Sequence, residues 1–444
     1  MVKNYAKYTF YITFIVVIIL LVIRLFNPFE IAGYKFKDID ILSDLQQTPP
    51  TLKKFVATSP HAAQLKKEPC EKGVTCIEDY SPNGQAMLAF ISALNSAKTE
   101  NVRVAFLGDS FIEGDIITED FREKMQVKFG GTGVGYAPIT EELTGCRKSL
   151  IIRSKNIDSY WLISRCRENE VGIGGNYYYP QSGATFSYKT SRFRAHIDTF
   201  YVSRLMYLNR NEGTKLSYSI NRTDEETIEL PASSQISIAE VSGKIGFLRY
   251  NVTNNTGVKL YGTYLDSPTG VCVDNYAMRG NSGLKLLSIP DATLKQIDSL
   301  LHYKLIVLQY GLNACGETTT NYDWYIDKMN IAIQKIKRCF PKSSILLLGV
   351  GDRCMRKNGE YVTMPGIINL LNEQRQMAID NQIAFWSIYD AMGGENSMNK
   401  FVKDGNAAKD FTHLSFSGGR VIGNKLFDAV MTEKKRYEKR EIYK

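Results

Sequence analysis

Residues 102–115 have the sequence VRVAFLGDSFIEGD, and the interpretation of the whole chain starts from this stretch. Its first half, VRVAFL, has the length and β-branched content of a buried strand. The strand pattern ends at Gly108, and Asp109 and Ser110 follow before a helical segment at about 117–128. Such a turn suits a nucleophile, because the strand end fixes the hydroxyl and a helix N-terminus favours an oxyanion. The competing interpretation is a plain strand and turn in which Ser110 has no chemical role.

The same alternation of apolar strands and amphipathic helices returns in the second half of the chain. Strand-like runs lie at 271–274, 305–309, 344–352 and 384–390, with helical segments at 291–301, 321–339, 365–381 and from Ser417 onward. This alternation predicts an α/β fold, with a parallel sheet covered by helices on both faces. Ligands of such sheets bind at the carboxyl ends of the strands. Ser110, Gly280, Asn313 and the 410–413 loop all follow predicted strands.

The segment between these two parts has a different pattern. From residue 145 to 270, short alternating runs are separated by turn residues, which predicts an inserted antiparallel β-sandwich, jelly-roll-like in character. Tyr177, Tyr178 and Tyr179 are candidates for stacking on sugar rings, although most tyrosines of a sandwich simply pack. The glycine-rich stretch at 129–139 does not follow a strand and open a helix, so it does not indicate a dinucleotide site.

The N-terminal stretch predicts a membrane anchor. Residues 8–23, YTFYITFIVVIILLVI, are almost free of polar groups, with Lys3 and Lys7 before them and Arg24 after them. This pattern favours a single transmembrane helix within 1–26, a cytoplasmic N-terminus and an extracytoplasmic remainder. No small-residue cleavage pattern follows, so the anchor is expected to be retained.

These observations divide the chain into successive parts. Residues 27–84 are expected to form a stalk, because they combine Pro, Lys, Gln and Ser with little periodicity. The α/β domain is expected at 85–144 and 271–432, with the β-sandwich inserted at 145–270. Residues 433–444 form a charged tail.

Composition excludes several classes of protein. The chain has 444 residues, 44% hydrophobic and 23% charged, which is ordinary for a globular protein. The net charge of +9 is spread along the chain, and the most basic cluster, EKKRYEKREIYK, is interleaved with Glu, so we predict no nucleic-acid partner. Of eight cysteines, Cys70 and Cys76 are close enough in sequence for a small disulfide. The remaining six lack paired spacing, so no zinc site is predicted. No cofactor is predicted for this chain.

A serine nucleophile requires a base, because its hydroxyl is weakly nucleophilic near neutral pH. Of the four histidines, only His413 lies in a loop after the α/β elements. Asp410, three residues earlier, is placed to orient and stabilise its imidazole. Candidate donors to an oxyanion are the backbone N–H groups of Ser110 and Gly280 and the side-chain amide of Asn313.

Four blocks of this sequence resemble those of the SGNH, or GDSL-like, hydrolases. They are Gly108-Asp109-Ser110, Gly280 within NYAMRGNSG, Gly311-x-Asn313 and Asp410-x-x-His413, and the resemblance covers about 100–140 and 271–430. It implies a flavodoxin-like three-layer α/β/α fold. It also implies that Ser110 is the nucleophile, His413 the base and Asp410 its partner, with Gly280 and Asn313 completing the oxyanion hole.

A narrower resemblance concerns the substrate. The stretches GDSFIEGD and FGGTGVGYAPI, with the inserted β domain, are similar to the peptidoglycan O-acetylesterase branch, although Phe111 stands where that branch is expected to have His. This resemblance implies an acetylated glycan as substrate. Three hypotheses follow: a membrane-anchored esterase, an O-acetyltransferase using the same site, and a glycan-binding protein without catalysis. The sequence assigns no oligomeric state.

Overall fold

The structure is a computed structural model that describes residues 5–25, 30–31, 34–35, 70–141, 147–164, 170–254 and 257–442. It divides into two units, Met1–Lys67 and Glu68–Lys444. In the first unit, helix α1 (Tyr5–Leu25) is followed by a short antiparallel pair, β1 (Glu30–Ile31) and β2 (Tyr34–Lys35). Most of the predicted stalk lies outside the described residues, and so do Cys146 and Cys166.

Helix α1 corrects the membrane prediction. Among the residues that the structure describes, no helix combines the length and the apolar character needed to cross a bilayer. In α1 the apolar run is confined between Lys7 and Arg24, which is shorter than the roughly 20 residues that a bilayer core requires. The predicted transmembrane anchor, and the localisation based on it, are therefore wrong.

The second unit is built on a six-stranded sheet. Its strands are β14 (Gly270–Ala277), β4 (Asn101–Gly108), β15 (Tyr303–Gln309), β16 (Ser344–Gly349), β19 (Ala384–Ser387) and β3 (Glu78–Asp79), in that spatial order. The first five are parallel, and β3 pairs antiparallel with β19 at the edge. Numbered along the chain, the parallel strands have the order 2-1-3-4-5 of flavodoxin-like folds. The parallel sheet predicted from the sequence is confirmed.

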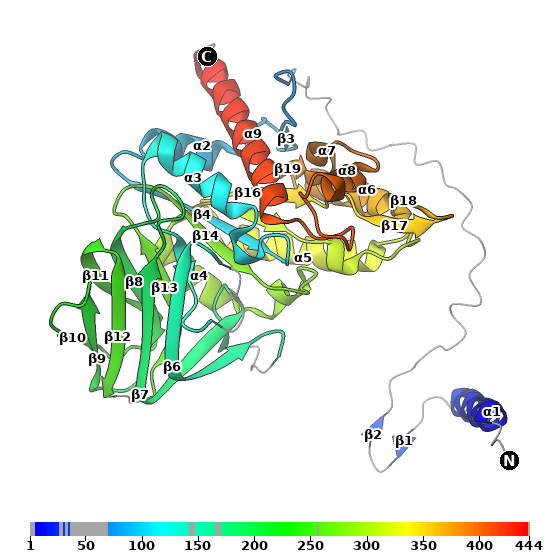
Figure 1. Cartoon of the computed structure of the whole chain (residues 1–444), viewed down its shortest axis with the longest axis horizontal. Helices are drawn as coiled ribbons and strands as arrows, with labels where there is room; N and C mark the ends of the chain where they lie inside the picture. Colours follow the sequence, from blue (N-terminus) through cyan, green and yellow to red (C-terminus); the bar gives the residue numbers. More distant parts are fainter. Residues whose placement is uncertain are drawn as a thin grey trace. The chain divides into compact units, whose positions relative to one another are not determined.

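Helices cover both faces of this sheet (Figure 1). One group packs together and against β4, β14, β15 and β16: α2 (Leu88–Asn95), α3 (Thr118–Phe129) and α9 (Phe416–Ile442). A second group comprises α4 (Asp291–Leu301), α5 (Asp323–Cys339) and α6 (Pro365–Asp380), of which α6 contacts β16 and β19. The short helices α7 (Ile388–Met392) and α8 (Ser397–Lys403) pack against each other, and α7 also contacts α9. The strands are apolar over almost their full length because both faces of the sheet are covered.

In the extra β domain, the described residues form nine antiparallel strands. They are β5 (Gly135–Ala137), β6 (Leu150–Trp161), β7 (Asn176–Thr190), β8 (Phe200–Leu208), β9 (Thr214–Ile220), β10 (Glu226–Leu230), β11 (Ser237–Ile245), β12 (Phe247–Asn254) and β13 (Lys259–Asp266). The long strand β7 pairs with β6 along most of its length, while its opposite edge pairs first with β13 and then with β12. This change of partner folds the strands around a separate hydrophobic core.

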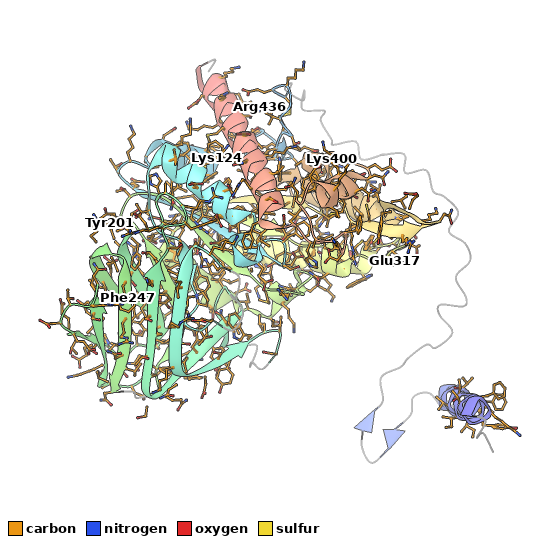
Figure 2. The ribbon with its side chains drawn as sticks, viewed as in Figure 1. Lys124, Tyr201, Phe247, Glu317, Lys400 and Arg436 are labelled. Atoms are coloured by element: carbon orange, nitrogen blue, oxygen red, sulfur yellow. A yellow bond between two sulfur atoms is a disulfide. The ribbon has the colours of Figure 1, made fainter. Side chains whose placement is uncertain are left out.

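The aromatic residues of the β domain mostly pack against one another. Tyr178 is fully buried, and Tyr177 stacks on Tyr160 with ring centroids 4.9 Å apart. Along β8 the buried Phe200 alternates with the exposed Tyr201, the pattern of a strand with one solvated face. Figure 2 shows Tyr201 and Phe247 on this domain.

A buried ion-pair network joins the two domains. Arg103 on β4, only 2% exposed, pairs with Asp274 on β14 at 2.9 Å and with Asp266 on β13. Arg204 on β8 also pairs with Asp266, at 2.6 Å, and the Tyr303 hydroxyl donates to Asp274 at 2.7 Å. Because buried carboxylates are stable only when paired and hydrogen-bonded, this network fixes how the two domains meet.

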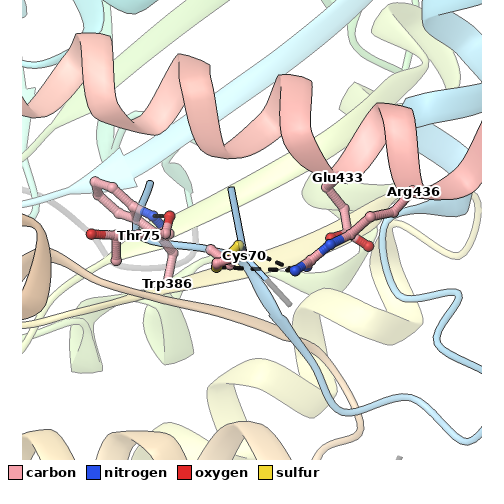
Figure 3. The surroundings of a disulfide bond; sticks show 6 residues. Cys70, Thr75, Trp386, Glu433 and Arg436 are labelled. Atoms are coloured by element: carbon pink, nitrogen blue, oxygen red, sulfur yellow. Dashed lines mark hydrogen bonds and ion pairs between the residues drawn. A yellow bond between two sulfur atoms is a disulfide. The ribbon is translucent and has the colours of Figure 1, made fainter. Parts of the chain in front are cut away.

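The disulfide between Cys70 and Cys76, predicted from their spacing, is present (Figure 3). The Arg436 guanidinium on α9 lies 3.2 Å from the Cys76 sulfur and pairs with Glu433 at 3.0 Å. The indole N–H of Trp386 on β19 donates to the Thr75 carbonyl at 2.9 Å. The disulfide loop is therefore attached to both the C-terminal helix and the edge of the sheet.

We expect Arg103→Leu to lower the free energy of unfolding by about 3–5 kcal/mol, because Asp266 and Asp274 would each lose a buried counter-charge. Urea unfolding of the variant and the parent measures this loss. The matched control is Arg153→Leu, which removes a solvent-exposed pair with Glu141 and should cost no more than about 1 kcal/mol. Equal losses for the two variants would contradict the structural role given to Arg103.

Candidate active site

The turn after β4 presents a single side chain to the surface. Asp109, Phe111 and Ile112 are buried, whereas Ser110 between them is partly exposed. Gly108 allows the Gln309 and Ile112 side chains to pack closely against the strand end, because a Cβ there would lie 2.8 Å from the Gln309 side-chain oxygen and from the Ile112 side chain. The sequence thus places one hydroxyl at the carboxyl end of the first parallel strand.

The loop before α9 brings His413 to this hydroxyl. The His413 Nε2 lies 3.1 Å from the Ser110 Oγ, and its Nδ1 lies 2.7 Å from the Asp410 Oδ2. The other carboxylate oxygen of Asp410 accepts hydrogen bonds of 3.0 Å from the backbone N–H groups of Thr412 and His413. The three side chains therefore form a continuous chain from hydroxyl through imidazole to carboxylate.

The local environment keeps Asp410 ionised. Partial burial alone would raise the pKa of Asp410. Hydrogen bonds from the His413 ring and from two backbone N–H groups outweigh that effect, so the pKa lies below its ordinary value. An ionised carboxylate at this position favours the Nδ1–H tautomer and leaves Nε2 free to accept a proton from Ser110.

Helix α9 places His413 by packing against the chain just after the nucleophile turn. A Cβ at Gly419 would lie 1.8 Å from the Ile116 carbonyl oxygen, so only glycine allows this approach. Because His413 precedes α9 by a few residues, the close packing brings it back to Ser110 although the two are far apart in sequence. The pair Gly418-Gly419 is the feature of the sequence that could have indicated this close approach.

Direct hydrogen bonds connect the loops that follow β4, β14 and β15. The backbone N–H of Met278 donates to the Gly108 carbonyl at 2.8 Å. The Asn313 side-chain amide donates to Asp109 at 3.0 Å and to the Asn281 carbonyl at 3.2 Å. All predicted site residues therefore lie on connected loops at one edge of the sheet, next to β4, where the strand order reverses.

Gly280 and Asn313 differ in their surroundings as candidate hydrogen-bond donors to an oxyanion. Gly280 lies between Met278 and Asn281 with φ +74°, and the space where its Cβ would be is open. The Asn313 Nδ2 already donates to two protein acceptors. Donation to an oxyanion requires that Asn313 exchange one of these hydrogen bonds for the substrate oxygen.

Asp109 lies next to the nucleophile and was not among the predicted site residues. It is fully buried beside Ser110, and this burial raises its pKa to about 6, although the Phe111 N–H, Gln309 and Asn313 act in the opposite direction. Its Oδ1 accepts from the Phe111 N–H at 2.9 Å, while its own N–H donates to Gln309 at 3.2 Å. The feature of the sequence that could have indicated a buried polar contact with Asp109 is the polar Gln309 at the end of an otherwise apolar strand.

A second buried carboxylate supports the segment that leads from Ser110 to α3. Asp115 pairs with Arg122 at 3.0 Å and with Arg147 at 2.9 Å. Burial alone would raise its pKa, but the two guanidinium groups hold the pKa well below its usual range. Thr118, in the first turn of α3, also donates to Asp115. The side chain of Thr118 thus attaches the first turn of α3 to Asp115.

An exposed ion pair borders the site. Arg279, next to Gly280, pairs with Glu113 at 2.6 Å, so it connects the loop after β14 to the turn after Ser110. Among the described residues, no group of three or more His, Cys, Asp or Glu side chains is arranged to hold a metal ion.

Comparisons with known proteins identify the fold. No family model matches the chain, and no curated protein matches it. A solved structure described as a peptidoglycan O-acetylesterase in action superposes with a TM-score of 0.68 at 19% identity, covering 81% of this chain and 99% of that chain. This superposition shows that the chain shares its overall fold with that structure.

Two other solved structures are similar only in part. One is a family two carbohydrate esterase from Cellvibrio japonicus, with 9% identity, a TM-score of 0.27 and coverage of 64% of this chain and 99% of that chain. The other is an acetylxylan esterase mutant from Geobacillus stearothermophilus, with 15% identity, a TM-score of 0.29 and coverage of 36% and 73%. At these TM-scores they add nothing to the description of the fold.

The raised pKa of Asp109 predicts a pH dependence of stability. Between about pH 4 and pH 6 the unfolded chain ionises this carboxyl while the folded protein keeps it protonated, so stability falls as pH rises through this window. A shift of about 2 pKa units corresponds to a loss of about 3 kcal/mol. Urea unfolding across pH 4–7 should therefore show a flatter dependence for Asp109→Asn than for the parent. Asp404→Asn, an exposed carboxylate, serves as the control and should leave the slope unchanged.

Proposed function

We propose that this protein is a serine esterase that removes O-acetyl groups from a polysaccharide. The observation that supports it most strongly is the position of His413, 3.1 Å from the Ser110 hydroxyl and 2.7 Å from the Asp410 carboxylate. This arrangement meets the geometric requirement for a general base acting on a serine nucleophile. It supports the enzymatic hypotheses over the hypothesis of a glycan-binding protein with an inactive α/β domain.

The proposed reaction has two halves. In the first, Ser110 Oγ attacks the acetyl carbonyl carbon while His413 Nε2 takes the hydroxyl proton. The oxyanion is stabilised by the N–H groups of Ser110 and Gly280 and by the Asn313 amide. The sugar hydroxyl then leaves with the proton from His413, and acetyl remains on Ser110. In the second half, water attacks the acyl-enzyme with His413 again as base, releasing acetate and restoring Ser110.

The openness of the site supports a polymeric substrate. The side chains of His413 and Asp410 are 47% and 49% exposed, and Ser110 is partly exposed. An acetyl group on a bulky glycan can reach such a site without threading through a narrow channel. The solved structure with the same overall fold is described as a peptidoglycan O-acetylesterase, which favours peptidoglycan over other acetylated polysaccharides.

The nucleophile is tested with p-nitrophenyl acetate. Ser110→Ala and His413→Ala should each lower kcat/KM by roughly 1000-fold or more. The double variant should be no worse than either single variant, because the two residues act in the same proton transfer. Ser299→Ala, which removes an exposed hydroxyl on α4, should retain the parent rate. Retention of the parent rate by Ser110→Ala would refute the assignment.

The substrate class is tested by acetate release from O-acetylated peptidoglycan and from acetylated xylan, measured side by side. We expect Ser110-dependent release from both polymers, with faster release from peptidoglycan. Addition of a deacetylated glycan acceptor tests the transferase alternative, in which acetyl appears on the acceptor instead of as free acetate. If p-nitrophenyl acetate is hydrolysed but neither polymer loses acetate, the esterase chemistry stands and the glycan assignment fails.

A further inference from the structure

A β-hairpin outside both main sheets contacts the loop that contains Asp410 and His413. Its strands are β17 (Cys354–Lys357) and β18 (Glu360–Thr363). From this hairpin the ring of Tyr361 stacks on the ring of Phe411, with centroids 3.6 Å apart and planes inclined by 10°. The backbone N–H of Cys354 also donates to the Phe411 carbonyl at 3.1 Å. The hairpin thus contacts both the side chain and the backbone of Phe411.

Phe411 adopts a backbone conformation that is energetically unfavourable for a residue other than glycine. Its φ is +54°, in the left-handed region that aromatic residues rarely occupy. The hydrogen bond from its N–H to the Ala408 carbonyl, at 3.2 Å, closes a turn at this point. Such a conformation persists only where surrounding contacts impose it. The contacts from Cys354 and Tyr361 add to the Ala408 hydrogen bond and to the packing of Phe411 against the main hydrophobic core.

This turn determines the geometry between Asp410 and His413. Because the chain reverses at Phe411, the N–H groups of Thr412 and His413 point to the Asp410 carboxylate, and the N–H of Ala408 donates to the His413 carbonyl at 2.8 Å. If Phe411 relaxed to a negative φ, this reversal would open. The imidazole of His413 would then lose its defined position between Asp410 and Ser110.

The hairpin itself is firmly attached to the α/β domain. The Thr363 hydroxyl donates to the fully buried Asp352 at 2.8 Å, and the N–H of Met398 donates to Asp352 at 2.7 Å. The N–H of Asn396 in turn donates to the Thr363 hydroxyl at 2.7 Å. Tyr361 therefore projects from a fixed support, which allows it to restrain Phe411.

We propose that Tyr361 is a positioning residue, which holds Phe411 in its left-handed conformation and so keeps His413 aligned with Ser110 for proton transfer. The inference rests on the proposed esterase function. Tyr361 acts through Phe411 and does not itself contact the reacting atoms. It is 39% exposed and outside the hydrophobic core, so its replacement can be tested without removing core packing.

The test compares Tyr361→Leu, which removes the flat ring, with Tyr361→Phe, which keeps it. On p-nitrophenyl acetate we expect Tyr361→Leu to lower kcat about 10–100-fold with KM changed less than about twofold, whereas Tyr361→Phe stays within about twofold in both. Adding Phe411→Gly to Tyr361→Leu should restore part of kcat, because glycine adopts φ +54° without strain. Tyr201→Leu, an equally exposed tyrosine on the β domain, should change neither constant.

A second measurement does not depend on turnover. In ¹⁵N-histidine spectra, the ring signals of His413 should shift in Tyr361→Leu and remain as in the parent in Tyr361→Phe. If the parent proves inactive but this pattern appears, the esterase proposal fails while the positioning role stands. If the His413 signals and kcat are both unchanged in Tyr361→Leu, the positioning role is refuted. A rise in KM confined to acetylated glycans would also refute it, since it would make Tyr361 a sugar-stacking residue.

Discussion

The buried pairing of Arg103 with Asp266 and Asp274 is the constraint on which the arrangement of the site depends. A guanidinium that is taken out of water must find carboxylates, and here they come from β13 and β14, which are consecutive along the chain. The pairing holds β14 beside β4 in a register where Ala277 lies opposite Gly108, so both strands end at the same level. For this reason the Met278 N–H reaches the Gly108 carbonyl, and the loops bearing Gly280 and Ser110 meet.

The supporting residues of the site are buried, while the reacting groups are exposed. Asp109 and Asp115 lie beneath the turn and are held by Asn313, Arg122 and Arg147. Burying these carboxylates costs free energy, which Arg122 and Arg147 offset for Asp115 but which the hydrogen bonds to Asp109 offset only in part, as its raised pKa shows. The resulting rigidity allows Ser110 and His413 to remain open to solvent and still keep a fixed separation, as preorganised catalysis requires.

The sequence allowed the α/β elements and the residues at the strand ends to be predicted, because both depend on local patterns. The strand before Gly108 is apolar throughout, and His413 was the only histidine in a loop after the α/β elements. The contacts that assemble the site, in contrast, do not follow from local sequence patterns. The hydrogen bond from Asn313 to Asp109 and the ion pair of Arg147 with Asp115 join residues far apart in sequence, and no local pattern encodes their geometry. The membrane anchor was mispredicted because the weight given to an apolar run outweighed its limited length between Lys7 and Arg24.

The inserted β domain also contributes to the geometry around Ser110. Arg147, just before β6, donates to the Val134 and Tyr136 carbonyls as well as to Asp115, so one side chain connects the β domain to the turn after the nucleophile. In the same way, Asp266 at the end of β13 pairs with Arg103 and connects the β domain to β4. Because both contacts are charged and buried, separating the domains would leave charges unpaired next to the site. The β domain is therefore part of the scaffold that holds Ser110 in place.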